Sequence, residues 1–241
     1  MIVTDKSVQL ESVKKVNIRK VFPGGESNEE NYTVVSEHTL QIILDNDDTI
    51  ETVCTPENLL ELVVGRLFTE NLIASRDDIV QIIMNSDGSR ADVTLTHTFA
   101  QFPEYQVLPD HSFCIQDVFA AAELFSEGSS IHRRTSGTHS CYLIGKNGKV
   151  FFSREDISRH NALDKVLGNA LLNDIRLSDK AIYTSGRVPL DMMQKVIHAG
   201  VPVLISKSVP TLQSMLMAEQ YGLTLVTSAW PDNIRLVAGH L

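Results

Sequence analysis

The sequence predicts an α/β protein in which a mixed sheet carries helices on both faces and follows a smaller part made of β-hairpins and one helix. In the second half of the chain, helical stretches alternate strictly with short apolar runs, a pattern typical of a sheet covered on both faces. In the first half, apolar runs come in pairs separated by turn-forming residues, which predicts hairpins. The 241 residues are 43% hydrophobic, enough for a sizeable core. We therefore expect a hairpin-and-helix part over residues 1–97 and an α/β core over 98–241.

The predicted N-terminal part contains two hairpins and a helix. Residues 8–22 are expected to form a strand, whereas the polar residues 26–31 are expected to be mobile. The hairpins pair 39–44 with 49–54 and 79–84 with 91–96. Between them Thr55, Pro56 and Glu57 supply a hydroxyl cap, a first-turn proline and an early acid, so a helix should begin there.

The predicted core begins with a helix at 118–125 and a polar, turn-like stretch at 132–141. A third hairpin joins 142–144 to 150–152 through an Asn-Gly turn. The expected helices and strands that follow are a helix to about 173, a strand at 181–183, a helix at 190–198, a strand at 203–205, a helix at 212–221 and a strand at 223–226.

Composition excludes several classes of protein. The net charge of −9 argues against a general nucleic-acid binder. No apolar run approaches membrane-spanning length and the first residues lack a signal-peptide pattern, so a cytoplasmic protein is expected. The three cysteines are scattered and odd in number, which indicates free thiols rather than a disulfide framework or a CxxC metal pair.

A polar stretch at 154–165, REDISRHNALDK, stands between a predicted strand and a predicted helix. In α/β folds ligands bind at the sheet edge where strands lead into helices. The alternative is a solvated loop before a capped helix, with Asn161 as the cap and Asp164 complementing the helix N-terminus. The candidate ligand contacts in this stretch are Arg154, Asp156, Arg159, His160 and Asn161.

Three predicted strands end in short loops of small residues and cations. These loops contain Ser185-Gly186-Arg187, Ser206-Lys207-Ser208 and Thr227-Ser228-Ala229, and Trp230 and Asn233 follow the third. If the strands are parallel, the loops share one edge and offer hydroxyls, amides and positive charge to a phosphate or pyrophosphate. The alternative is that Ser and Thr only cap helices. Neither a Walker loop nor a dinucleotide fingerprint is present.

Two histidines stand in polar, strand-end surroundings. His160 could donate to a phosphate or carry a proton, or could be a helix-start residue bonded to backbone. His139 lies two residues before Cys141, and the two could hold a metal if His160 joined them. Structural zinc sites usually need a fourth ligand and none is evident, so no metal is assigned.

Several motifs together resemble the formate dehydrogenase accessory protein family, FdhD. They are RED-x-x-RHNA-x-DK at 154–165, TSGR at 184–187 with Met192 and Lys195, AG-x-PVL at 199–204, GLTL at 222–225, TP-x-x-x-x-EL-x-x-G-x-x-x-TE at 55–70 and TSGTH at 135–139, which is similar to TGG-x-H. The resemblance covers most of the chain beyond about residue 40, and its most specific parts are RED-x-x-RHN and SGR.

The resemblance implies a fold, a function and partners. It implies a cytidine-deaminase-like three-layer core without the deaminase zinc motif. It implies a homodimer that passes sulfur from a cysteine desulfurase to the molybdenum cofactor before insertion into formate dehydrogenase. The ligand would be bis-molybdopterin guanine dinucleotide, or a GDP-like nucleotide that resembles its end.

One departure bears on the sulfur chemistry. The family's C-G-x-C-G motif belongs between the second hairpin and the helix near Val118, where residues 99–113 contain no CxxC. Cys114 precedes an apolar helix and Cys54 lies in a predicted strand, so both are expected in apolar surroundings. Cys141, beside His139, is the candidate persulfide carrier.

Three functions are therefore open. The first is a sulfur-transferring maturation factor for formate dehydrogenase. The second is a cofactor-binding chaperone of the same fold that has lost sulfur transfer. The third is a nucleotide-processing enzyme that uses His160 with Asp156 or Asp164 as acid and base.

Overall fold

The computed structural model describes residues 1–8, 10–45, 48–96 and 105–241. Its larger sheet has the strand order β13-β12-β11-β10-β8-β9. These strands are β8 (His139–Ile144), β9 (Val150–Asp156), β10 (Ala181–Thr184), β11 (Val203–Ser206), β12 (Thr224–Trp230) and β13 (Asn233–Ala238). Strands β10, β11 and β12 are parallel, and β8, β9 and β13 complete the sheet with antiparallel pairings. The predicted mixed α/β class is confirmed.

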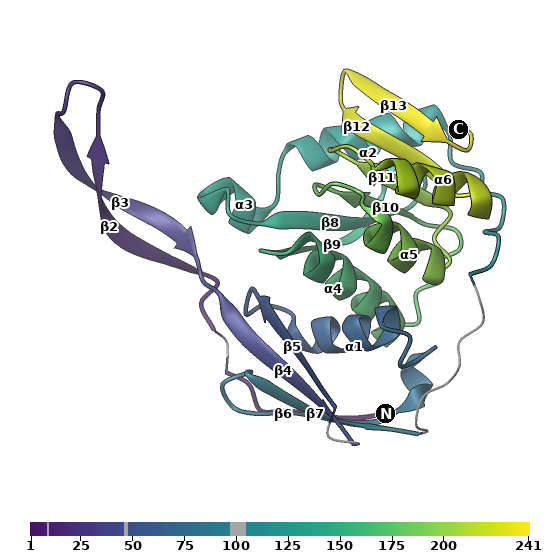
Figure 1. Cartoon of the computed structure of the whole chain (residues 1–241), viewed down its shortest axis with the longest axis horizontal. Helices are drawn as coiled ribbons and strands as arrows, with labels where there is room; N and C mark the ends of the chain where they lie inside the picture. Colours follow the sequence, from purple (N-terminus) through teal and green to yellow (C-terminus); the bar gives the residue numbers. More distant parts are fainter. Residues whose placement is uncertain (9, 46–47, 97–104) are drawn as a thin grey trace.

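Helices cover both faces of this sheet (Figure 1). Helix α2 (Ile115–Ser126) packs on one face. Helices α4 (Arg159–Leu172), α5 (Leu190–His198) and α6 (Leu212–Tyr221) lie on the other. Within β10, Ile182 belongs to the apolar cluster on the α4 side and Tyr183 to the cluster on the α2 side. Because both faces are buried, the strands read as continuous apolar runs.

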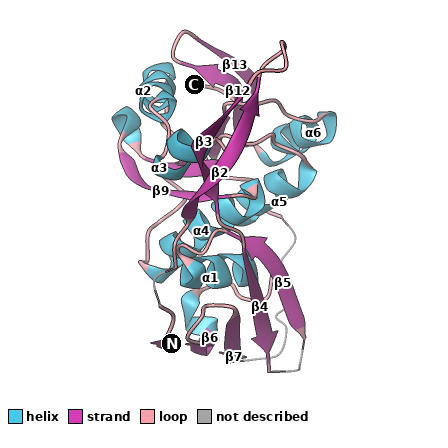
Figure 2. Cartoon of the chain, turned by 90° about the vertical axis from the view of Figure 1, so that its left-hand side faces the viewer, coloured by secondary structure: helices cyan, strands magenta, loops and turns pink. Residues whose placement is uncertain are grey.

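A second sheet lies beyond α4, with the order β1-β6-β7-β4-β5. Its strands are β1 (Ile2–Asp5), β4 (His38–Leu44), β5 (Thr49–Cys54), β6 (Ile79–Met84) and β7 (Arg90–Leu95). Helix α1 (Leu59–Thr69) lies between this sheet and α4, as Figure 2 shows from the side. The predicted hairpins β4–β5 and β6–β7 are confirmed. The proposed domain boundary at 97/98 falls in 97–104, outside the described residues.

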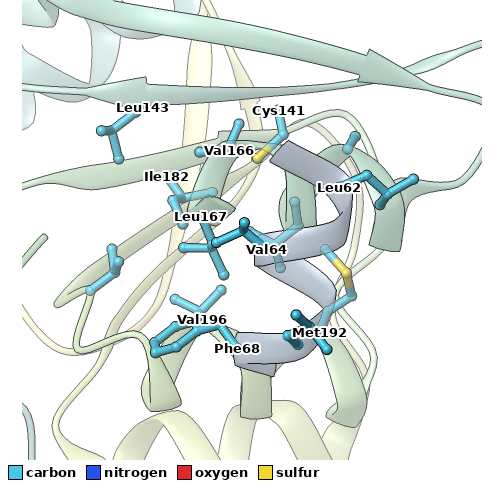
Figure 3. Packing of buried hydrophobic residues seen from close by; sticks show 14 of the residues in the cluster. Leu62, Val64, Phe68, Cys141, Leu143, Val166, Leu167, Ile182, Met192 and Val196 are labelled. Atoms are coloured by element: carbon cyan, nitrogen blue, oxygen red, sulfur yellow. The ribbon is translucent and has the colours of Figure 1, made fainter. Parts of the chain in front are cut away.

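Apolar side chains from α1, α4, α5 and the larger sheet form one cluster (Figure 3). Leu62 and Phe68 come from α1, Val166 from α4 and Val196 from α5, and all are buried. The two sequence halves are therefore joined by a common core in which α1 and α4 are the central elements.

Strands β2 (Val13–Val21) and β3 (Ser27–Val35) form a separate two-stranded ribbon that extends away from the body (Figure 1). The prediction that residues 26–31 are mobile is wrong, because Ser27 to Asn31 pair with β2. Opposite charges meet across the ribbon: Arg19 lies directly opposite Glu29, and Lys20 forms a diagonal ion pair with Glu30 at 3.8 Å. Such cross-strand pairs stabilise a strand that its polarity alone would not indicate.

Three element boundaries differ from the prediction. Helix α1 begins at Leu59 rather than at Thr55, whose buried hydroxyl bonds to Asp156 instead of capping the helix. The polar stretch 132–141 is not a single turn, since α3 (Ser130–Thr135) occupies part of it and β8 begins at His139. Strand β12 runs on to Trp230 and pairs with β13, which the sequence did not predict.

Two short 3-10 turns, Arg76–Asp78 and Lys146–Gly148, complete the described elements. Within the described ranges, no helix is both long and apolar enough to cross a membrane.

Candidate functional site

The three predicted loops lie at one edge of the larger sheet. Thr184 pairs with Ser206 across β10 and β11, and Val226 of β12 pairs with Ile205. Because these strands are parallel, the loops after them emerge at the same edge. Strand β9 also ends there at Asp156, opposite His139 at the start of antiparallel β8. We call the surface formed by residues 184–187, 206–208 and 227–230 the strand-end edge.

Side-chain hydroxyls hold the first loop to its neighbours. The Ser140 N–H donates to Ser185 Oγ at 3.0 Å, and His139 Nδ1 lies 3.1 Å from the same oxygen. The Gly186 N–H donates to Thr184 Oγ1 at 3.2 Å, and the Gly186 carbonyl accepts from Ser206 Oγ at 2.8 Å. The loop is thus fixed by bonds from two adjacent strands.

The second and third loops are joined in the same way. The Ser208 N–H donates to Ser206 Oγ at 3.0 Å, and the Ser208 carbonyl accepts from the Ser228 N–H at 2.9 Å. Arg235 of β13 donates to Ser228 Oγ at 2.8 Å. The serines of the edge therefore shape it, and a ligand would meet a surface whose geometry is already set.

Three cationic side chains belong to this edge. Arg187 is exposed, and Lys207 is half-buried with its Nζ 4.4 Å from the centre of the Trp230 ring. Arg159, from the first turn of α4, lies on Gly186, where an added Cβ would come within 2.7 Å of the arginine Cβ. Gly186 is therefore required for the arginine to pass over the first loop.

The guanidinium of Arg159 carries an unused donor. Its Nε–H is buried and has no hydrogen-bond partner within the described part of the chain. Buried donors are nearly always satisfied, so an unpaired one needs an explanation such as an absent acceptor. An anionic ligand at the strand-end edge would supply that acceptor.

Both histidines are near the edge, and burial lowers the pKa of each. For His139 the nearby Arg159 guanidinium lowers the pKa further. His160 Nε2 lies 3.5 Å from Asp191 Oδ2 at the start of α5, and that carboxylate acts against the effect of burial on the pKa. Near pH 7 both rings are neutral, so they can exchange hydrogen bonds with a ligand but add no positive charge.

Arg154, Asp156 and Asn161, predicted as ligand contacts, use their polar atoms inside the protein. The Arg154 guanidinium binds the carboxylate of Glu61 in α1 through two nitrogens, one of them at 2.6 Å. Asn161 Nδ2 donates to Asp156 at 3.0 Å and to the Val53 carbonyl at 2.8 Å. These bonds tie β9 and α4 to β5 and α1, and direct contact of the three with a ligand stays a prediction.

Two buried lysines, Lys165 and Lys195, whose role the sequence did not predict, form ion pairs beside these residues. Lys165 Nζ lies 2.7 Å from Asp156, and Lys195 Nζ lies 2.7 Å from Asp164, with both carboxylates fully buried. An acid–base role for Asp156 or Asp164 beside His160 would require breaking one of these ion pairs. One sequence signal could have revealed them: each lysine falls on the face of its predicted helix where the neighbouring residues are apolar.

The Glu155 carboxylate also binds groups inside the protein, at the start of α3. It accepts from the N–H groups of Ile131 and His132 in the first turn of α3 and from the Thr138 hydroxyl at 3.0 Å. An acidic group at a helix N-terminus stabilises the helix. Most polar side chains of the 154–165 stretch therefore have partners inside the protein, and Arg159 and His160 are the members that contact the first loop and the start of α5.

None of the three cysteines is both exposed and located at the strand-end edge. Cys141 is fully buried among apolar side chains (Figure 3), and burial together with Asp164 raises the pKa of its thiol. Burial raises the pKa of Cys54 to about 12. A persulfide carrier needs an exposed thiolate, so the burial of Cys141 disfavours the role predicted for it, and that role stays a prediction.

Cys114 is exposed, which corrects the expectation of apolar surroundings. Its Sγ lies 3.3 Å from Asp117 Oδ2 at the start of α2. Asp117 also accepts from the Asn147 N–H in the turn after β8, at the end of the sheet opposite His139. The exposed thiol and the strand-end edge therefore lie at opposite ends of the sheet.

Among the described residues, no group of three or more His, Cys, Asp or Glu side chains is placed to hold a metal ion.

Comparison with known proteins decides the family. The family model described as FdhD/NarQ matches residues 35–107 and 95–240, which is most of the chain. The chain belongs to the FdhD/NarQ family. The resemblance inferred from RED-x-x-RHN and SGR is confirmed.

Relatives in the FdhD/NarQ family match over nearly their whole length. The sulfur carrier protein FdhD of Bacillus pumilus (strain SAFR-032) is 29% identical over 256 residues, which cover 95% of this chain and 97% of the relative. That of Bacillus subtilis (strain 168) is 31% identical over 236 residues, covering 85% and 88%. The protein of the same name from Sulfolobus acidocaldarius is 30% identical, covering 89% and 92%.

The FdhD/NarQ fold is also shared with a solved structure. A crystal structure described as a formate dehydrogenase accessory protein from Desulfotalea psychrophila aligns with a TM-score of 0.82 and 27% identity. The alignment covers 94% of this chain and 96% of that one. The chain is therefore a member of a sulfur-carrier and formate dehydrogenase accessory family.

Proposed function

We propose that this FdhD/NarQ protein is a formate dehydrogenase maturation factor that binds the guanine dinucleotide form of the molybdenum cofactor at the strand-end edge. The observation that carries the proposal is the buried Nε–H of Arg159, which has no partner among the described residues and belongs to a side chain that contacts Gly186. A diphosphate offers acceptors for this donor.

The side chains at the edge match the chemistry of that ligand. Arg159 and Arg187 would contact phosphate oxygens, and Lys207 would add a third positive charge. Backbone N–H groups of short loops bind anions without further charge. His139 and His160 would donate or accept hydrogen bonds as neutral rings. When bound, the cofactor would supply the redox chemistry of the client enzyme, while this protein would only hold it.

The cysteine positions favour a binding factor without a thiol relay over a sulfur-transferring one. Cys54 and Cys141 are buried, and Cys114 is exposed at the end of the sheet away from the strand-end edge. The second candidate is sulfur transfer by Cys114. It rests on the exposure of that thiol and on the names of the relatives.

Membership of the FdhD/NarQ family extends the proposal to the partners of this protein. A second copy of this chain, a cysteine desulfurase and formate dehydrogenase are the expected partners, and the cytoplasm is the expected place. The β2–β3 ribbon has two open edges and needs cover, which supports a homodimer. Light scattering at micromolar concentration should give the dimer mass, and a monomer mass alone would count against this partner.

Calorimetry tests the central proposal. The whole protein is titrated with GDP, ADP, inorganic pyrophosphate and guanosine in low salt. GDP and pyrophosphate should bind, GDP more tightly, and the affinity should fall as salt rises because the contacts are ionic. Guanosine should bind far more weakly than GDP. Absence of binding by both GDP and pyrophosphate would remove the phosphate site from the strand-end edge.

A further inference from the structure

A large aromatic side chain stands at the end of the third loop. Trp230 is the last residue of β12, and 42% of its surface is exposed. It is also the only tryptophan in the sequence. Lys207, from the second loop, places its ammonium 4.4 Å from the ring centre. The indole ring is thus partly exposed to solvent at the strand-end edge, beside the positive charge of Lys207.

The backbone before Trp230 has an unusual conformation. The pairing of β12 with β13 shifts register between Thr227 and Trp230, and Ser228 has a φ of +44° although it is not glycine. A bulge of this kind changes the direction in which the following side chains point. Left-handed backbone at a non-glycine residue costs free energy and is concentrated at ligand sites.

Hydrogen bonds from both sides hold this conformation. The buried Tyr183 hydroxyl donates to the Ala229 carbonyl at 2.7 Å. The Ser228 N–H donates to the Ser208 carbonyl at 2.9 Å, and Arg235 donates to Ser228 Oγ at 2.8 Å. The backbone that carries Trp230 is therefore fixed before binding, so little conformational entropy would be lost when a flat ligand stacks on the ring.

The distance across the edge suits a nucleotide. Adjacent strands lie about 4.8 Å apart, so the ends of β10 and β12 are roughly 10 Å apart. Arg159 and Arg187 lie at the β10 end, Trp230 lies at the β12 end, and Lys207 lies between them. A nucleoside diphosphate separates its base from its terminal phosphate by a comparable length.

We infer that Trp230 is the stacking surface for the purine base of a nucleoside diphosphate whose phosphates bind Arg159 and Arg187. The inference rests on the proposed function and adds the residue that recognises the base. Stacking on an aromatic ring is favourable for any base, so it contributes affinity, and larger purines gain more contact than pyrimidines. The competing explanation is an ordinary surface pair of lysine and tryptophan.

The single tryptophan makes the test direct, because all indole fluorescence comes from Trp230. GDP should quench this fluorescence, whereas pyrophosphate should bind in calorimetry with little quenching. Trp230→Ala should weaken GDP binding by roughly 5- to 100-fold and leave pyrophosphate binding unchanged. Trp230→Phe should retain most of the GDP affinity.

Phe151→Ala is the matched control. Phe151 is 40% exposed and also lies beneath lysines, with Lys149 and Lys180 over its ring, but it belongs to β9 near the opposite end of the sheet. The control should bind GDP like the unaltered protein. If Trp230→Ala binds GDP with unaltered affinity, the stacking role is overturned while the phosphate site stands. If the unaltered protein binds neither GDP nor pyrophosphate, the proposed function fails and this inference with it.

Discussion

Gly168 of α4 lies directly on the backbone of Glu61 in α1, so close that an added Cβ would come within 1.9 Å of the Glu61 carbonyl oxygen. The contact is reciprocal one turn away, where a Cβ on Gly65 would come within 1.8 Å of the Asp164 carbonyl oxygen. Two glycines therefore let the helices cross backbone to backbone. This crossing holds α4, whose first turn carries Arg159 and His160, in place against the first half of the chain.

Replacing Gly168 with alanine should destabilise the protein. The overpacked contact typically costs about 1–3 kcal/mol and exceeds the roughly 0.5–1 kcal/mol that alanine gains in a helix. Urea denaturation followed by circular dichroism measures the change in the free energy of unfolding. Gly24→Ala is the control, since nothing lies within 4 Å of an added Cβ there. Equal stability of the two variants would show that the helices can separate without loss.

Replacing Arg187 with alanine should weaken GDP binding. An exposed guanidinium that bonds to a phosphate typically contributes about 1.5–3 kcal/mol. Calorimetry should show the loss, and the melting temperature should stay close to that of the unaltered protein because Arg187 is exposed. Arg19→Ala, on the distant β2–β3 ribbon, removes the same charge and should bind GDP normally. Unchanged affinity in Arg187→Ala would exclude this residue from the site.

The stability of the protein should fall as the pH is lowered from about 7.5 to 5.5. Burial lowers the pKa of His111, His139, His160 and His198 in the folded state. In the unfolded chain these rings take up protons near pH 6.5. The unfolded state then binds more protons than the folded state just below that pH, so acid favours unfolding.

Urea midpoints at the two pH values measure this effect. Carboxylates contribute little in the window because their ordinary pKa values are near 4. His139→Asn keeps a polar group near Ser185 and should show a smaller drop between the two pH values. A midpoint that is constant or rises toward pH 5.5 would contradict the assignment of half-buried histidines with lowered pKa values.

Incubation with a cysteine desulfurase and cysteine should add no stoichiometric sulfur to the protein. Transfer would break the S–S bond of the donor persulfide and form a new one on the acceptor thiol, with the donor leaving as a thiol and no net oxidation. Cys54 and Cys141 are buried with raised thiol pKa values, which disfavours the attacking thiolate. Intact-mass spectrometry reads the result.

Two variants make the sulfur experiment decisive. A single-sulfur adduct that disappears in Cys141→Ala would restore the carrier role of that residue and would require the core around it to open. An adduct that disappears in Cys114→Ala would show sulfur transfer by the exposed thiol at the other end of the sheet.

The sequence by itself determined the α/β class, two N-terminal hairpins and the helices 190–198 and 212–221, because periodicity and turn residues are local signals. It also predicted that three loops lie at one edge of the sheet, because the carboxyl ends of parallel strands lie at the same edge. It identified the FdhD/NarQ family through motifs whose spacing is preserved along the chain.

Only the tertiary structure decided what the residues of 154–165 do. Arg154, Asp156 and Lys165 are polar in sequence and therefore suggest a solvated or ligand-binding surface, but their partners Glu61 and Thr55 lie 93 to 110 residues away along the chain. The same holds for Cys141, whose burial depends on helices that pack on its strand. Local sequence fixes which groups can donate or accept, but long-range packing decides whether the partner is the protein itself or a ligand.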